Sequence, residues 1–163
     1  MAVKLDHIRL DVADIDAAET FYAEALGLRR VIRYDLGSRV ILQMAPDGLP
    51  AGVELWREDG LVPAPHPTQH IAFAVSDVSA LLGHIRSLGY QVLTEPYKIG
   101  AETVAFVADL DGHIIELNDF RGRGVAETAR PDPASGQEGQ PSGRNRGRHD
   151  EVPGAAPALC PLP

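Results

Sequence analysis

The stretch LDHIRLDVADIDAAETFYAEALGL, residues 5–28, joins the pattern of a strand to the pattern of a helix. Polar and apolar residues alternate over Leu5–Val12, which is typical of a half-buried strand. Apolar residues then recur at helical spacing. Asp14 and Asp16 precede this helix as candidate N-caps, and Glu19 follows Asp16 by three residues, as in a capping box. The stretch therefore predicts a strand followed directly by a helix.

The same pattern occurs a second time, 62 or 63 residues later. In both copies a glycine follows the helix and acts as its stop signal. A repeat of this length indicates two structural units of the same kind. The matched segments are His7-Ile8 with His70-Ile71, Asp14-Ile15 with Asp77-Val78, Gly27-Leu28 with Gly89-Tyr90, and Val53-Glu54-Leu55 with Ile115-Glu116-Leu117.

Each copy continues into three further short strands, so the unit is βαβββ. We predict an α+β fold of two tandem units, at 1–56 and 69–120, with a connector at 57–68. The strand pairing is expected to be antiparallel and mixed. The expected strands are Leu5–Val12, Leu28–Tyr34, Arg39–Ala45 and Ala51–Trp56, then Gln69–Val75, Tyr90–Leu93, Thr103–Val107 and His113–Asn118.

The composition changes after Phe120. Residues 121–163 hold 7 of the 13 prolines and 7 of the 16 glycines, and they contain no Phe, Tyr or Trp. Such a segment buries too little apolar surface to offset the entropy lost on ordering. We predict that 121–163 is a disordered tail rich in Pro and Gly.

The charge of the chain argues against several classes of partner. Residues 1–120 carry 9 Lys and Arg against 18 Asp and Glu, which disfavours nucleic acids and anionic membranes. No apolar run approaches the length of a membrane span, and the N-terminus MAVKLDHIRL lacks the apolar region of a secretory signal. Cys160 is the single cysteine, which excludes a disulfide within the chain. We therefore expect a cytoplasmic protein that binds neither nucleic acid nor membranes.

Two histidines and two glutamates occupy equivalent positions in the two copies: His7, Glu54, His70 and Glu116. Each glutamate stands between two apolar residues, which pack on the helix, so its carboxylate projects from the opposite sheet face. A carboxylate in such a strand carries a heavy desolvation cost unless a cation shares it. The matched set favours a metal site. The alternative is a pair of hydrogen-bonded core histidines with glutamates on exposed edges.

These features resemble the vicinal oxygen chelate superfamily, which includes glyoxalase I, bleomycin-resistance proteins and extradiol dioxygenases. The resemblance covers residues 3–120. It implies that the two units form a cupped mixed β-sheet with the helices on its outer face. It rests on the segments LDHIRLDVADIDAAETFYAEALGL, GVELW, QHIAFAVSDV and ADLDGHIIELNDF.

The resemblance implies that His7, Glu54, His70 and Glu116 bind a divalent metal ion. Nitrogen and oxygen ligands suit Ni, Co, Zn, Mn or Fe. The implied function is a glyoxalase-like lyase or isomerase, which converts a small substrate with adjacent oxygens through an enolate. By resemblance Glu116 is the first candidate for the catalytic base and Glu54 the second. Small members of the superfamily usually pair, so we expect a homodimer, with a slight preference for sites shared between two chains.

The expected substrate contacts are Arg9, Asp11, Trp56 and Asn118. Members that bind glutathione carry Arg four residues after the first His and Asn four residues after the first Glu. Asp11 and Glu58 occupy these positions here. Arg9 is open to two interpretations, as a substrate contact or as the ion-pair partner of Asp11.

Two aromatic side chains near the proposed ligands are also open to interpretation. Trp56 either forms a wall of the pocket or packs at the end of its strand. His113, next to the Asp111-Gly112 turn, is expected at the rim or surface.

Two other functions remain open on the sequence. One is an Fe(II)-dependent extradiol-type dioxygenase. The other is a non-catalytic protein that binds a drug or metabolite and confers resistance. The metal that the protein carries distinguishes them, because the dioxygenase requires iron and the binding protein requires no metal.

Overall fold

The α+β class predicted from the repeat is confirmed. The computed structural model describes residues 3–49 and 52–119, which form two βαβββ units in tandem. The predicted tail at 121–163 lies outside the described residues, as does Ala51, the first residue of one expected strand. No helix in the described part of the chain is long and apolar enough to cross a membrane.

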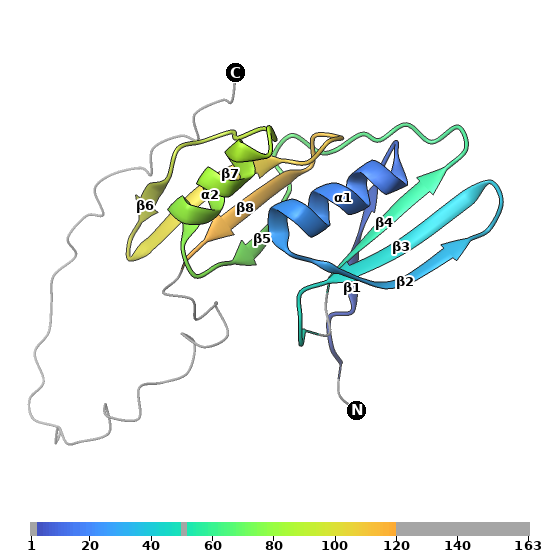
Figure 1. Ribbon diagram of the computed structural model, residues 1–163, viewed down its shortest axis with the longest axis horizontal. Helices are drawn as coiled ribbons and strands as arrows, with labels where there is room; N and C mark the ends of the chain where they lie inside the picture. Colours follow the sequence, from blue (N-terminus) through green and yellow to red (C-terminus); the bar gives the residue numbers. More distant parts are fainter. Residues whose placement is uncertain (1–2, 50–51, 120–163) are drawn as a thin grey trace, which may run out of the picture. The chain divides into compact units, whose positions relative to one another are not determined.

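The two units, which we call module 1 and module 2, contain the same elements in the same order (Figure 1). Module 1 consists of β1 His7–Asp11, α1 Ile15–Leu26, β2 Arg29–Asp35, β3 Arg39–Ala45 and β4 Gly52–Glu58. Module 2 consists of β5 His70–Ala74, α2 Val78–Ser87, β6 Tyr97–Ile99, β7 Glu102–Ala108 and β8 Ile114–Asn118.

Each module forms its own four-stranded sheet, with strand orders β1-β4-β3-β2 and β5-β8-β7-β6. The first and last strands of a module run parallel, while the other pairs are antiparallel. The parallel register sets Arg9 beside Glu54 in one sheet and Ala72 beside Glu116 in the other. Figure 1 shows α1 along the sheet of module 1 and α2 along that of module 2. The helices leave the opposite face of each sheet uncovered, and this face can carry a functional site.

The ends of α1 are fixed by local hydrogen bonds. Asp14 is the N-cap, because its carboxylate accepts the backbone N–H groups of Asp16 and Ala17, each at 3.0 Å. The predicted capping box on Asp16 is wrong, since Glu19 instead accepts two hydrogen bonds from Arg30. Gly27 ends the helix in the left-handed region at φ 68°, where an L-residue is strained, as the sequence predicted.

The strand expected at Tyr90–Leu93 is wrong. This segment makes one isolated bridge, between Val92 and Val107, and the sheet's edge strand is β6, further along the chain. The segment nevertheless lies beside β7, because Leu93 N–H donates to the Phe106 carbonyl at 2.8 Å and Ala108 N–H donates to the Gln91 carbonyl at 3.1 Å. The Tyr90 ring packs edge-on against Phe21 with ring centroids 4.8 Å apart.

The two modules of the chain share one core. Phe21 and Tyr22 of α1 and Leu82 and Ile85 of α2 all belong to it. At most 1% of the surface of each of these residues is exposed. Burial of each such side chain contributes about 1.5–3 kcal/mol. Strand alternation places Ile8 of β1 on the same face as the buried Leu10, but Ile8 is 41% exposed.

Polar contacts also join the modules. The Asp111 carboxylate accepts the backbone N–H of Ala13 at 3.1 Å, and His84 Nε2 lies 2.8 Å from the Glu24 carbonyl oxygen. Module 2 is therefore held against module 1 by specific hydrogen bonds in addition to the core.

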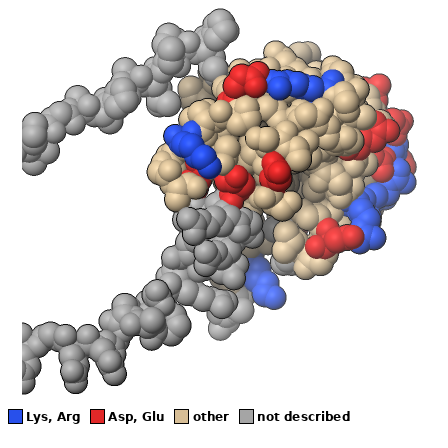
Figure 2. Space-filling model, turned by 60° about the vertical axis from the view of Figure 1, so that its left-hand side comes forward, with Lys and Arg blue, Asp and Glu red and all other residues tan. Residues whose placement is uncertain are grey.

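Charged side chains of the described residues pair across the surface. Arg30 lies 2.6 Å from Glu19, and Arg33 lies 2.6 Å from Asp16. Figure 2 shows acidic and basic residues close to one another on the visible face. Exposed pairs of this kind contribute about 0–1 kcal/mol each.

Candidate metal centre

The four predicted ligands lie on the sheet faces that the helices leave free. In β4, Val53 and Leu55 are buried in the core, and the side chain of Glu54 between them projects the other way. In β8, Ile115 and Leu117 are likewise buried, so Glu116 also projects away from the core. We call these two surfaces the ligand-bearing faces of module 1 and module 2.

On module 1, His7 and Glu54 lie together. His7 Nε2 is 3.6 Å from Glu54 Oε2, and His7 Nδ1 is 2.7 Å from the Asp6 carboxylate. A carboxylate on Nδ1 holds the ring proton there and leaves the Nε2 lone pair for a metal. Gln43 of β3 donates its amide to Glu54 Oε2 at 3.0 Å, which orients a carboxylate that is only 9% exposed.

On module 2, His70 and Glu116 form the corresponding pair. His70 Nε2 is 2.9 Å from Glu116 Oε2, and Asn118 donates its amide to the other oxygen, Oε1, at 3.2 Å. The His70 ring packs edge-on against Phe106 at 5.7 Å. Each carboxylate thus has one imidazole and one amide as neighbours.

The structure brings these residues together as two pairs, one on each sheet. Within the described part of this single chain, no group of three or more His, Cys, Asp or Glu side chains is placed to hold one metal ion. The donors themselves suit a divalent transition metal, because each pair offers an imidazole nitrogen and a carboxylate oxygen. Two pairs together supply the four ligands that the sequence predicted.

The other predicted contacts of module 1 form a charge-balanced cluster. Arg9 binds Asp11 through Nε at 2.8 Å and Nη2 at 2.7 Å, which is the ion pair that one interpretation predicted. The guanidinium carbons of Arg9 and Arg39 lie 4.0 and 4.9 Å from the centre of the Trp56 ring. Trp56 is therefore a stacking platform on the ligand-bearing face. We call these residues, with Glu58, the Arg–Trp cluster.

Glu58 completes this cluster. It accepts hydrogen bonds from Arg39 at 2.8 and 3.2 Å and from the Trp56 indole at 3.2 Å. The hydrogen bond from Arg39 lowers the pKa of Glu58, so this carboxylate is ionised at neutral pH.

The sequence analysis missed Gln43 and Arg39. Gln43 had a signal, because it is a polar residue between apolar neighbours in the strand RVILQMA. Its register beside Glu54 follows only from the pairing of β3 with β4. Arg39 had no comparable signal, since a basic residue at the start of a strand is ordinary.

Comparison with known proteins assigns the fold to a family. Residues 4–117 match the family described as Glyoxalase/Bleomycin resistance protein/Dioxygenase superfamily. The chain belongs to this superfamily. The expectation from the sequence motifs is confirmed.

Named relatives of this superfamily member are lyases. It is 32% identical over 119 residues to "Lactoylglutathione lyase GLX1" of Arabidopsis thaliana, covering 68% of this chain and 42% of that protein. It is 34% identical over 120 residues to the "Lactoylglutathione lyase" of Haemophilus influenzae, covering 68% of this chain and 88% of that protein. The chain therefore spans less than half the length of the plant relative.

A solved structure of similar fold is the trypanothione-dependent glyoxalase I of Leishmania major. It superposes with a TM-score of 0.64 at 26% identity and covers 74% of this chain and 88% of that one.

His113, which the sequence analysis places at the rim or surface, has a mostly buried side chain. Its side chain is 12% exposed, and its Nδ1 is 2.8 Å from Oδ2 of Asp109. Tyr22 of α1 donates its hydroxyl to the same oxygen at 2.9 Å. The Asp109 side chain is 2% exposed, so a buried carboxylate joins His113 to module 1.

The protonation of these groups follows from their contacts. Burial alone would lower the pKa of His113, but the hydrogen bond and charge of Asp109 raise it above its usual range. Burial alone would raise the pKa of Asp109, but the hydrogen bonds from His113 and Tyr22 lower it. Burial raises the pKa of Tyr22, which keeps its hydroxyl protonated as a donor. The network is thus an imidazolium bound to a carboxylate.

These shifts predict a pH dependence of stability. Because its pKa is raised in the folded protein, His113 contributes its full stabilisation at pH values below 6.5, the pKa of the unfolded chain. This contribution is lost as the pH rises through the pKa of the folded protein. Because its pKa is lowered in the folded protein, Asp109 contributes its full stabilisation at pH values above 3.8, the pKa of the unfolded chain. This contribution is lost as the pH falls through the pKa of the folded protein. We expect the free energy of unfolding in urea to decline on the alkaline side in the wild type, and the decline to be smaller in His113→Gln. An identical alkaline decline in both proteins would contradict this assignment.

Proposed function

We propose that this chain is a metal-dependent lyase of the glyoxalase I type, which interconverts a 2-hydroxyacyl thioester with a 2-oxoaldehyde and a thiol. The observation that carries the proposal is the pair of His–Glu couples, His7 with Glu54 and His70 with Glu116, on equivalent faces of two repeated modules. The names of the relatives support the reaction class. A lactoyl thioester splits into a thiol and the three-carbon 2-oxoaldehyde, so the atoms balance without a further reactant.

The metal would be held by His7, Glu54, His70 and Glu116. When bound, it supplies a Lewis acid that stabilises the negative charge developing on the adjacent substrate oxygens. The tautomer of His7 supports this role, because the Asp6 carboxylate on Nδ1 leaves Nε2 free. The amides of Gln43 and Asn118 hold the two carboxylates in position.

Glu116 is the proposed base. In the adduct of the thiol with the 2-oxoaldehyde, it takes the proton from the carbon that bears sulfur and returns it to the neighbouring carbon. Asn118 binds Oε1 and orients the carboxylate, and Oε2, which lies 2.9 Å from His70 Nε2, is the oxygen proposed to exchange the proton. Glu54 is the second candidate and is the less exposed carboxylate, at 12% of its side chain against 17% for Glu116.

The Arg–Trp cluster bears on the choice of thiol. Its two cations are already bound to two carboxylates on the ligand-bearing face of module 1. These two carboxylates are Asp11 and Glu58, which occupy the positions where glutathione-binding members carry Arg and Asn. We propose that the part of the substrate that carries the thiol contacts this surface, on which the charges balance. Arg9 would contribute its remaining N–H donors, and Asn118 would contact the substrate from the ligand-bearing face of module 2.

Each site is proposed to form between two chains of a homodimer. Both ligand-bearing faces expose large apolar side chains, which favours a covering partner. Ile32 and Tyr34 are 37% and 47% exposed on module 1, and Tyr97 and Ile99 are 43% and 55% exposed on module 2. A second copy that covers them would set the His–Glu pair of one protomer against the complementary pair of its partner.

Metal analysis of the purified protein tests the proposed function. We expect one equivalent of Ni, Co, Zn or Mn per chain, and loss of turnover on chelation with recovery on adding the metal back. Iron together with oxygen consumption would instead support an extradiol-type dioxygenase. A metal-free protein that binds its ligand equally well with a chelator present would support a binding protein. Either of these two results contradicts the proposal.

A further inference from the structure

A cavity of about 300 Å³ lies between β1 and β5, the strands that begin the two modules. Its size is at the lower end of the range for small-molecule sites. His70 is the one predicted ligand in its wall, and neither Glu54 nor Glu116 lines it. The cavity is therefore a space distinct from the carboxylates of the proposed metal centre.

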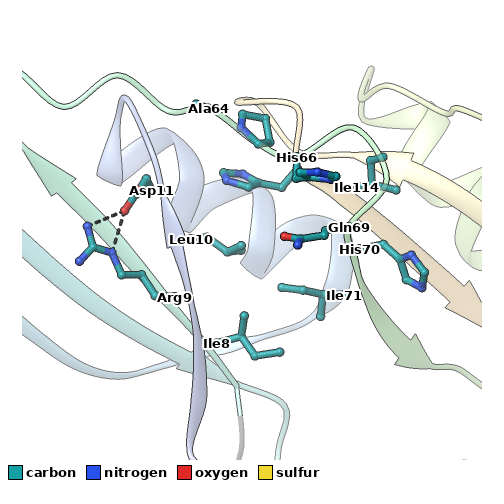
Figure 3. A pocket seen from close by; sticks show the side chains of 12 residues that line it. Ile8, Arg9, Leu10, Asp11, Ala64, His66, Gln69, His70, Ile71 and Ile114 are labelled. Carbon is teal, nitrogen blue, oxygen red and sulfur yellow. Dashed lines mark hydrogen bonds and ion pairs between the residues drawn. The ribbon is translucent and has the colours of Figure 1, made fainter. Parts of the chain in front are cut away.

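The cavity has a largely aliphatic part. Figure 3 shows Ile8 and Leu10 of β1 facing Gln69 and Ile71 of the other module across the space. Ile114 adds a further aliphatic side chain. This part would receive a short alkyl chain, and it contains Ile8, which is 41% exposed although it shares a strand face with buried Leu10.

The polar part of the cavity contains the imidazole of His113, which is held in place by Asp109. His113 lines the cavity, and its Nδ1 is bound to Asp109. Asp109 is itself held by Tyr22 and by the backbone N–H groups of Asp111 and His113. Nε2 is thus the ring nitrogen of His113 that remains for a ligand.

A second imidazole lines the same cavity. The backbone N–H of Thr68 donates to His66 Nδ1 at 3.3 Å, and the Thr68 hydroxyl lies 3.1 Å from the same nitrogen. An accepting Nδ1 places the ring proton on Nε2, so His66 offers an N–H donor. The Gln69 amide adds a further donor in the cavity wall.

The carboxylates near this cavity are already bound. Asp11 is paired with Arg9, as the dashed lines in Figure 3 mark, and Asp111 accepts a hydrogen bond from Ala13. The cavity thus offers N–H donors without an unpaired carboxylate among these groups. The titratable and charged groups that surround His113 are Asp11, Asp109 and Asp111, with Arg9, His66 and His70 in the rest of the wall.

We propose that this cavity binds a small aliphatic monocarboxylate, with its carboxylate on Nε2 of His113 and His66 and its alkyl chain on Ile8, Leu10 and Ile71. One proton is shared between the carboxylate and His113, so binding to the neutral imidazole takes up a proton. The raised pKa of His113 favours this charged pair. The site goes beyond the proposed lyase function and requires no metal.

Calorimetric titration with isovalerate tests the site, with isovaleramide as a neutral ligand of the same shape. We expect isovalerate to bind and the amide to bind at least about tenfold more weakly, because an ionic hydrogen bond is lost. Repeating the titration in two buffers of different ionisation enthalpy should reveal proton uptake above the folded pKa of His113. A histidine that only supports the fold would not produce this uptake.

Two variants complete the test. His113→Gln is expected to weaken isovalerate binding at least about tenfold, whereas Glu102→Gln at the start of β7, which does not line the cavity, should leave it unchanged. If His113→Gln does not fold, the nitrogen resonances of His113 in the wild-type protein should shift on adding isovalerate. Equal binding of acid and amide, no binding of isovalerate, or unmoved His113 resonances would overturn the proposal.

Discussion

Replacing Glu116 with Gln is expected to abolish turnover and to leave the fold intact. The amide has nearly the same shape as the carboxylate, and the side chain is only 17% exposed, so packing around it is retained. A neutral amide cannot take the substrate proton. Removing a general base costs roughly 10²–10⁴-fold, so kcat should fall by that factor. The assay uses the adduct of methylglyoxal with glutathione and, in parallel, with 2-mercaptoethanol, which lacks charged arms.

The interpretation of this variant needs two controls. Excess metal should not restore kcat, which separates loss of the base from weaker metal binding. Glu102→Gln, at the start of β7 on the same face of module 2, should retain activity because Glu102 is not next to His70. Glu116→Gln protein with its metal and full activity would refute the assignment of the base.

Much of the fold could be predicted because the chain repeats itself. The offset between His7 and His70 established two units, and the apolar neighbours of Glu54 and Glu116 established which face each carboxylate takes. Local alternation fixes a side chain's face because the strand has a period of two. These inferences required no knowledge of distant contacts.

The remaining features depend on contacts between distant segments. His113 is buried because Asp109 is bound by Tyr22, which is 87 residues away in sequence. The segment at Tyr90–Leu93 lies beside β7 without forming a regular strand, and its Tyr90 ring packs on Phe21 of the other module. Alternation within one strand carries no information about such partners.

The site shows the same division. The sequence predicts two His–Glu pairs, but the separation of the pairs depends on how the modules pack, which spacing does not encode. The Arg9–Asp11 ion pair could be predicted from two side chains on one strand face. The stacking of Arg39 on Trp56 could not, because it requires the register of β3 with β4.

Two inactive variants are expected to restore activity when mixed, if each site forms between two chains. His7→Ala damages the ligand pair of module 1, and Glu116→Ala damages that of module 2. In a mixed dimer, one site combines both damaged modules and the other combines both intact modules. Random exchange makes half of the dimers mixed, so about a quarter of the wild-type sites should return.

Mixing His7→Ala with Glu54→Ala provides the matched control. Both changes lie in module 1, so every site in a mixed dimer contains a damaged module and no activity should return. Subunit exchange is verified in both mixtures by native mass spectrometry of one isotope-labelled partner.

The activity of exchanged His7→Ala and Glu116→Ala protein is therefore the most direct test that each site combines the His–Glu pairs of two different chains. Our account predicts recovery to about a quarter of wild-type activity in this mixture and none in the control. Complete exchange without any gain in activity would contradict it, because sites within single chains would all remain broken.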